Sequence, residues 1–199
     1  MRCCHFNPSN PLLVAFGSYE GSVYIYNTEK KGLENELKAS KKKIACVQWH
    51  PQFEYIMAAA CFDNNVYVFD IKYDGSKVFE FHTDRVRSLI WNTELPWHLT
   101  SAADDSKVAV WDIRTSSLIF STTEPSLALT SFASHPERPF VYYSSHFDAS
   151  IMQWTLLEQP DIGLSQLKFL LRNTIDEVVC DFHSLMNLNL SMKLTGVTS

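Results

Sequence analysis

Short apolar segments alternate with polar turn-forming residues along the first 155 residues. Segments such as Ile44–Trp49 and Val86–Trp91 are rich in β-branched and aromatic residues and are bounded by turn formers, which is typical of β-strands. We expect a second strand after each, a third after a tight turn, and a weaker fourth. The expected second strands are 12–18, 55–61, 97–102 and 140–145; the third are 23–27, 66–70, 108–112 and 151–155; the fourth are 34–38, 77–81 and 118–122.

These segments repeat with a fixed period. The third strands end in aromatic residues that are 43, 42 and 43 positions apart, namely Tyr26, Phe69, Trp111 and Trp154. Six positions before each aromatic residue stands an acid, namely Glu20, Asp63, Asp105 and Asp148. Twelve positions before each acid stand Pro8, Pro51, Thr93 and Pro136. Because three independent markers keep one register in four copies, the sequence predicts four copies of one structural unit.

Four strands in about 40–45 residues is the repeat of a WD-type propeller blade. The third unit carries the residues by which the chain resembles the WD-repeat family, namely His82, Ser101, Asp105 and the pair Trp111-Asp112. The resemblance implies that the first four of these side chains form a hydrogen-bonded network that braces the blade. The other units keep fewer members, namely Asp63 in the second and Ser144, Asp148 and Trp154 in the fourth, where Pro125 stands in place of the histidine.

The expected fold is therefore all-β: a WD-repeat β-propeller of four consecutive four-stranded blades in a partial or open ring, with a short C-terminal extension. The blades are expected within residues 1–156, at about 1–38, 39–81, 82–122 and 123–171, the last range including its outer strand. Residues 172–199 are expected to form a short helix and a frayed tail.

WD propellers usually have about seven blades, so a four-blade chain leaves three alternatives open. The chain is a piece of a longer propeller, an open half-ring completed by a partner, or a small closed ring. Residues 86–96 and 135–140 also resemble the last blades of one member of the family, in which a helical segment follows the propeller.

Composition narrows the function classes. The chain has 46% hydrophobic and 20% charged residues and a net charge of −5, so it is not built to coat nucleic acid or an anionic membrane. It contains no apolar run long enough to span a bilayer. The five cysteines do not have the spacing of a disulfide framework, which favours reduced thiols and a cytoplasmic, intracellular location.

The residues that could take part in catalysis or metal binding mostly fall on repeat-equivalent positions. His50 and His135 occupy the same corner before a proline, and His82 matches the brace. Cys3-Cys4-His5 lacks the paired spacing of a metal site. We therefore expect no catalytic residue, no metal and no cofactor. An enzyme with its active site in the propeller funnel is the alternative, and it predicts a cluster of titratable groups at the centre that breaks the repeat.

Two surfaces are candidates for partner binding. In the resembled family, residues entering the first strand and residues just before the turn acid line the top face of the ring and contact partners. Carried over by position, the top-face residues are Tyr19, Lys43, Phe62, Arg85, Asp104 and Phe147. The stretch from Lys30 to Lys43 carries six lysines and could instead bind nucleic acid or an acidic partner, although a solvated loop is the simpler interpretation.

The resulting hypothesis is a protein-interaction scaffold that assembles an intracellular multiprotein complex. The expected partners are other proteins, which could include further blades of the same propeller; nucleic acid and a membrane span are not expected.

Overall fold

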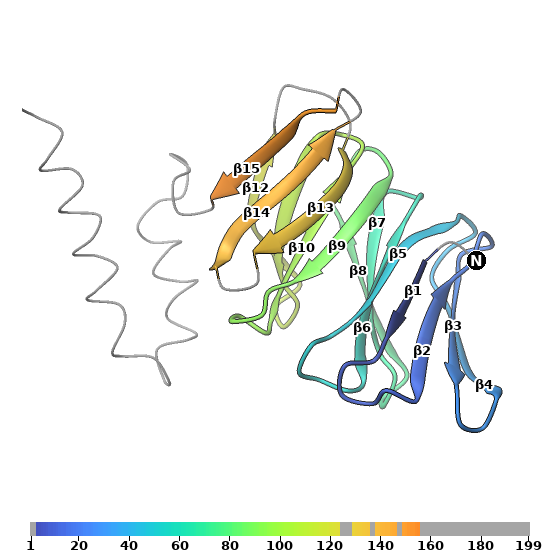
Figure 1. The fold of residues 1–199 in the computed structure, drawn as a ribbon. Helices are drawn as coiled ribbons and strands as arrows, with labels where there is room; N and C mark the ends of the chain where they lie inside the picture. The colour runs from blue at the N-terminus through green and yellow to red at the C-terminus, as the bar shows by residue number, and fades with distance from the viewer. Residues whose placement is uncertain (1–2, 124–128, 136–137, 147–148, 156–199) are drawn as a thin grey trace, which may run out of the picture. The chain divides into compact units, whose positions relative to one another are not determined.

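The computed structural model describes residues 3–123, 129–135, 138–146 and 149–155 (Figure 1). These residues form fifteen β-strands in four antiparallel sheets. The all-β prediction and the propeller-blade arrangement are confirmed.

Each sheet is made of strands that follow one another in the chain. The first sheet contains β1 (Cys3–Phe6), β2 (Leu13–Gly17), β3 (Ser22–Asn27) and β4 (Gly32–Lys38). The second contains β5 (Ile44–Trp49), β6 (Ile56–Cys61), β7 (Asn65–Asp70) and β8 (Gly75–Glu80). The third contains β9 (Val86–Trp91), β10 (His98–Ala103), β11 (Lys107–Asp112) and β12 (Ser117–Thr123). The fourth contains β13 (Leu129–His135), β14 (Arg138–His146) and β15 (Ile151–Thr155).

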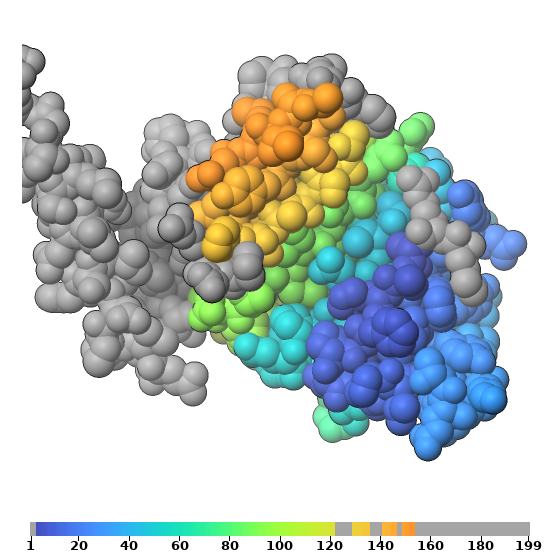
Figure 2. All heavy atoms as spheres, viewed as in Figure 1, coloured from blue at the N-terminus to red at the C-terminus, as the bar shows by residue number. Residues whose placement is uncertain are grey.

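Consecutive sheets pack face to face through their inner strands. Contacts join β1 to β5, β5 to β9 and β9 to β13, and the four sheets lie side by side in chain order in Figure 2. Alternating residues of each strand supply the two faces. In the second blade Ala59 and Phe69 pack toward the first blade, whereas Ala58 and Val68 pack toward the third.

The turns repeat as closely as the strands do. A residue in the left-handed region ends each β-hairpin turn between the second and third strands, namely Gly21, Asn64, Ser106 and Ala149. A second series occupies the turn before each outer strand, namely Lys31, Asp74 and Ser116. Because each of these turns closes on that residue, the outer strand begins at the next one, one or two residues earlier than the sequence pattern indicates.

Adjacent blades are joined by a repeated corner residue. The side chain of His50 accepts hydrogen bonds at Nδ1 from the backbone N–H groups of Gln52 and Phe53, at 3.0 and 2.9 Å. Its Nε2 lies 2.6 Å from the carbonyl oxygen of Pro96 in the third blade. Because a carbonyl oxygen only accepts, the ring is the neutral tautomer with its proton on Nε2.

The equivalent corners of the first and third blades carry asparagine. Asn7 accepts from two backbone N–H groups of its own turn and donates to the carbonyl oxygen of Glu54 in the second blade, at 2.9 Å. Asn92 accepts from two N–H groups in the same way, and its Nδ2 lies 3.5 Å from the hydroxyl of Tyr142 in the fourth blade. Each corner side chain thus holds its own turn and reaches forward to the next blade.

Some expected elements lie outside the described residues. These are the outer strand of the fourth blade, which the expected range 123–171 includes, and the helix and tail at 172–199. The blade boundaries at about 1–38, 39–81, 82–122 and 123–171 therefore remain a proposal for the chain as a whole.

Candidate functional site

The expected bracing residues of the third blade lie together. Nδ1 of His82 is 3.2 and 3.3 Å from the two carboxylate oxygens of Asp105, and its Nε2 is 2.8 Å from Oγ of Ser101. The indole N–H of Trp111 donates to the same Oγ at 2.8 Å. Burial opposes ionisation of Asp105, but hydrogen bonds from His82 and from the backbone N–H groups of Thr83 and Lys107 outweigh it and lower the pKa of that carboxyl.

The second blade satisfies its turn acid differently. Asp63 accepts from the hydroxyl of Tyr67 at 2.6 Å and from the backbone N–H of Asn65 at 3.1 Å. Burial opposes ionisation of Asp63 as well, yet hydrogen bonds from Ser40 and Tyr67 lower its pKa. Ser40 stands 23 residues before Asp63, as His82 does before Asp105, so the hydroxyl groups of Ser40 and Tyr67 take the place of the histidine in the second blade.

In the fourth blade, Oγ of Ser144 lies 2.9 Å from Nε2 of His146. Asp148 and the side chain of Trp154 lie outside the described residues, so their bracing role remains a prediction.

The top-face residues are placed by the same backbone contact in successive blades. Phe62 follows β6, and its N–H donates to the carbonyl oxygen of Lys43, which precedes β5, at 3.0 Å. The N–H of Asp104 donates to the carbonyl oxygen of Arg85, which precedes β9, also at 3.0 Å. Each residue before a turn is thus held next to the residue that enters the first strand of its blade.

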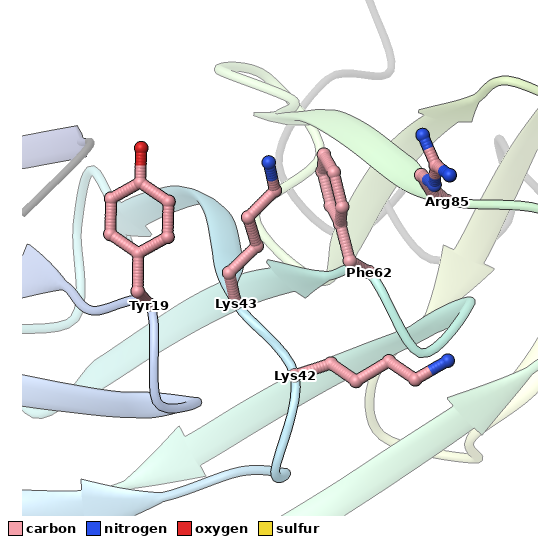
Figure 3. A pocket seen from close by; sticks show the side chains of 5 residues that line it. All are labelled: Tyr19, Lys42, Lys43, Phe62 and Arg85. Carbon is pink, nitrogen blue, oxygen red and sulfur yellow. The ribbon is translucent and has the colours of Figure 1, made fainter.

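Four of the expected residues meet at one open pocket of about 440 Å³, and Lys42 joins them. The top-face pocket is lined, among the described residues, by Tyr19, Lys42, Lys43, Phe62 and Arg85. In Figure 3 the side chains of Tyr19, Lys43, Phe62 and Arg85 stand in a row and point to the same side, while Lys42 extends across below them. The pocket spans three blades, because Tyr19 belongs to the first and Arg85 to the third.

Phe62 is the centre of this pocket. Nζ of Lys43 lies 4.0 Å from its ring centroid, and the guanidinium carbons of Arg85 and Arg87 lie 5.4 and 5.1 Å away. Lys43 also lies 5.6 Å from the ring centroid of Tyr19, whose side chain is 60% exposed. Such cation–π contacts keep the cationic groups near the rings without neutralising their charge.

Arg87 was not among the expected site residues. It forms a two-point ion pair with Asp104, with Nε and Nη2 at 2.7 and 2.6 Å from the two carboxylate oxygens, and this pair raises the pKa of Arg87. The side chain of Asp104 is only 8% exposed, so it supports Phe62 through Arg87 and presents little surface of its own. Arg87 stands two residues after Arg85, so both side chains fall on one side of the extended chain that leads into β9, and this spacing is the sequence signal for Arg87. Phe147 lies outside the described residues.

The lysine stretch does not form one patch. Lys30 and Lys31 lie in the turn before β4, whereas Lys42 and Lys43 lie beyond its other end. The seven residues of β4 separate the two groups by roughly 20 Å at about 3.3 Å per residue. Lys30 pairs with Glu34 at 3.0 Å, which lowers the pKa of that carboxyl.

A second pocket of about 410 Å³ lies against the inner strands. Its described lining is mostly apolar and aromatic, including Trp49, Trp91 and Phe132, and His5 is its single ionisable residue among those described. Burial lowers the pKa of His5, and its Nδ1 accepts from the backbone N–H of Trp49. The described lining thus offers no acid–base pair to the funnel-enzyme alternative.

The thiols of Cys46 and Cys61 are not suited to catalysis. Burial raises the pKa of the Cys46 thiol to about 12 and that of Cys61 to about 11, so neither is a ready nucleophile. No group of three potential metal ligands gathers anywhere in the described part of the chain. Within those residues there is also no helix with the length and apolar character needed to cross a bilayer.

Comparison with known families agrees with the geometry. The family described as WD domain, G-beta repeat, matches residues 32–70 and 75–112. Residues 32–70 and 75–112 are thus similar to two WD repeats. Each matched WD repeat begins with the outer strand of one blade, β4 or β8, and continues through three strands of the next blade. One sequence repeat therefore bridges two structural blades.

The relatives that this chain resembles are much longer proteins. Protein transport protein SEC31 of Dictyostelium discoideum is 25% identical over 122 residues, which cover 55% of this chain and 9% of that protein. Protein transport protein Sec31A of Danio rerio is 28% identical over 124 residues, covering 57% and 10%. The 78 kDa intermediate chain of the flagellar outer arm dynein of Chlamydomonas reinhardtii is 25% identical over 122 residues, covering 53% and 18%. The chain thus matches less than a fifth of the length of each.

Proposed function

We propose that this WD-repeat chain is a non-catalytic scaffold that binds partner proteins through its top-face pocket within an intracellular, cytoplasmic assembly. The observation that carries the proposal is the convergence of Tyr19, Lys43, Phe62 and Arg85 from three blades on one open pocket. Exposed aromatic and arginine side chains are the residues that contribute most to protein–protein binding. The relatives named above are a transport protein and a dynein chain by their names, which fits an assembly role.

Rigid blades support such a role because they fix the relative positions of the binding side chains. The backbone contacts that hold Phe62 next to Lys43 lie directly after strand β6, inside a packed sheet. The closer resemblance of residues 86–96 and 135–140 to WD repeat-containing protein seventeen stays a prediction. The same resemblance predicts a helical segment after the propeller.

The test is affinity capture from cell extract with the 199-residue chain, the Phe62→Ala/Arg85→Glu double variant, and a control variant, Tyr73→Ala. Tyr73 is 75% exposed and lies in the turn before β8, outside the pocket. We expect the double variant to lose proteins that the wild-type chain and the control both retain, while its circular dichroism and unfolding midpoint stay unchanged. Identical captured sets from all three folded proteins would overturn the assignment of the top-face pocket.

A further inference from the structure

The top-face pocket is electrically distinct from the rest of the chain. Three of its five described lining residues are cationic and none is acidic, whereas the whole chain carries a net charge of −5. A local positive site on a negatively charged protein selects for a ligand whose negative charge is equally local.

Two acids contact arginines at this face, and neither contact neutralises Arg85. Asp104 is occupied by the two-point pair with Arg87. Oδ1 of Asp84 lies 4.0 Å from Nε of Arg85, and both side chains are 54% exposed, so solvent screens this contact strongly. Lys42 and Lys43 add two more positive charges from the loop before β5.

The spacing of the cations suits an extended peptide. Lys43 Nζ and the Arg85 guanidinium lie 4.0 and 5.4 Å from the centroid of the same Phe62 ring, and Figure 3 shows the ring standing between them. Their separation is therefore at most the sum of those two distances. Side chains on one side of an extended strand recur about every 6.6 Å, so acids two residues apart can reach both cations.

We propose that the top-face pocket binds an extended acidic segment of a partner protein, with two carboxylate side chains two residues apart, one at Lys43 and one at Arg85. This inference rests on the proposed scaffold function and names the partner chemistry of the same pocket. A peptide fits better than nucleic acid, because a long polyanion would extend beyond the pocket into the field of an acidic protein, while a short segment would not.

The test measures fluorescence anisotropy of labelled peptides with the whole 199-residue chain at low salt. The probe is an otherwise neutral peptide with glutamates at positions i and i+2. One control peptide carries glutamine at both positions, and a second has its two glutamates adjacent. We expect the alternating glutamate peptide to bind at least about tenfold more tightly than the glutamine peptide and several-fold more tightly than the adjacent one.

Matched variants locate the binding. Arg85→Gln and Lys43→Gln should each weaken binding of the alternating peptide by about five- to tenfold. Lys30→Gln removes the same charge beyond the far end of β4 and should leave binding unchanged. Equal binding of the glutamate and glutamine peptides, or wild-type affinity in both pocket variants, would overturn the inference. A single-stranded oligonucleotide of equal charge that binds more tightly than the peptide would overturn it as well.

The result separates the two proposals. If acidic peptides fail to bind while the Phe62→Ala/Arg85→Glu variant still loses captured proteins, the charge assignment falls and the scaffold function stands. If both experiments fail, the top-face pocket is not a binding site.

Discussion

The corner residue His50 offers a direct test of how the blades are joined. His50→Ala removes a side chain that is fully buried and that engages three backbone groups, two in its own turn and one in the next blade. His50→Asn replaces it with asparagine, which makes the corresponding hydrogen bonds at Asn7 and Asn92. The pair of variants therefore separates the hydrogen bonds from the aromatic ring.

The structure sets the size of each effect. Leaving buried backbone groups without partners costs about 1–3 kcal/mol each, and the loss of the ring also leaves a cavity, so we expect His50→Ala to lower the free energy of unfolding by about 3–5 kcal/mol. His50→Asn loses mainly the ring contacts with Phe53 and Trp91, whose centroids are 4.5 and 4.6 Å away. Aromatic contacts of this kind contribute about 0.5–1.5 kcal/mol each, so we expect a loss of about 1–3 kcal/mol.

The same residue gives stability a pH dependence. Burial lowers the pKa of His50 in the folded chain, and the carbonyl of Pro96 offsets only part of this. The unfolded chain, with a histidine pKa of about 6.5, takes up the proton first, so this contribution is complete above that pH and is lost as the pH falls below it. Asparagine does not titrate, so the stability gap between wild type and His50→Asn should narrow toward pH 5.5. His5 and His98, whose pKa values are also lowered by burial, are present in both proteins and cancel.

The assay is urea unfolding of wild type, His50→Ala and His50→Asn at pH 7.5 and pH 5.5, followed by tryptophan fluorescence and circular dichroism. The interpretation requires His50→Asn to be more stable than His50→Ala by about 2 kcal/mol at pH 7.5. Equal stability of the two variants would refute the forward hydrogen bond to Pro96 as a link between blades. A gap between wild type and His50→Asn that does not change with pH would refute the assignment of a neutral ring.

Three further substitutions test the turns and the brace. Asp105→Ala removes the acceptor of His82 and of two backbone N–H groups and should lower the free energy of unfolding by about 1–3 kcal/mol; a wild-type urea curve would contradict this role. Ser106→Gly relieves a left-handed backbone with φ of 61° and should raise stability by up to about 1 kcal/mol, seen as a higher melting temperature; a lower one would be the wrong sign. Gly21→Ala places a Cβ against the carbonyl oxygen of Ser40 at φ of 85° and should cost about 2 kcal/mol or more, whereas an unchanged melting temperature would show that the turn adapts.

The repeat made the blades predictable from sequence, because strand alternation and turn acids are local signals. Segments such as β5 and β9 have the predicted bounds for this reason. The links between blades were not predictable. His50 differs in residue type from Asn7 and Asn92, and the shared function of the three depends on which carbonyl or hydroxyl the next blade brings within reach.

The candidate site was predictable in part for a related reason. Positions carried over from the resembled family included Tyr19, Lys43, Phe62 and Arg85. These four residues line one pocket, because equivalent backbone contacts place them. Asp104 occupies an equivalent position, but its side chain turns to Arg87, and that pairing depends on the distance between two strands rather than on the repeat.

The ring of Phe62 affects how much entropy the pocket loses when it binds a partner. Lysine and arginine side chains each have about 2 kcal/mol of rotamer entropy to lose when a ligand immobilises them. Lys43 and Arg85 rest against the ring. A partner therefore meets cations with part of their freedom already removed, and replacing Phe62 would weaken binding even by a ligand that never touches the ring.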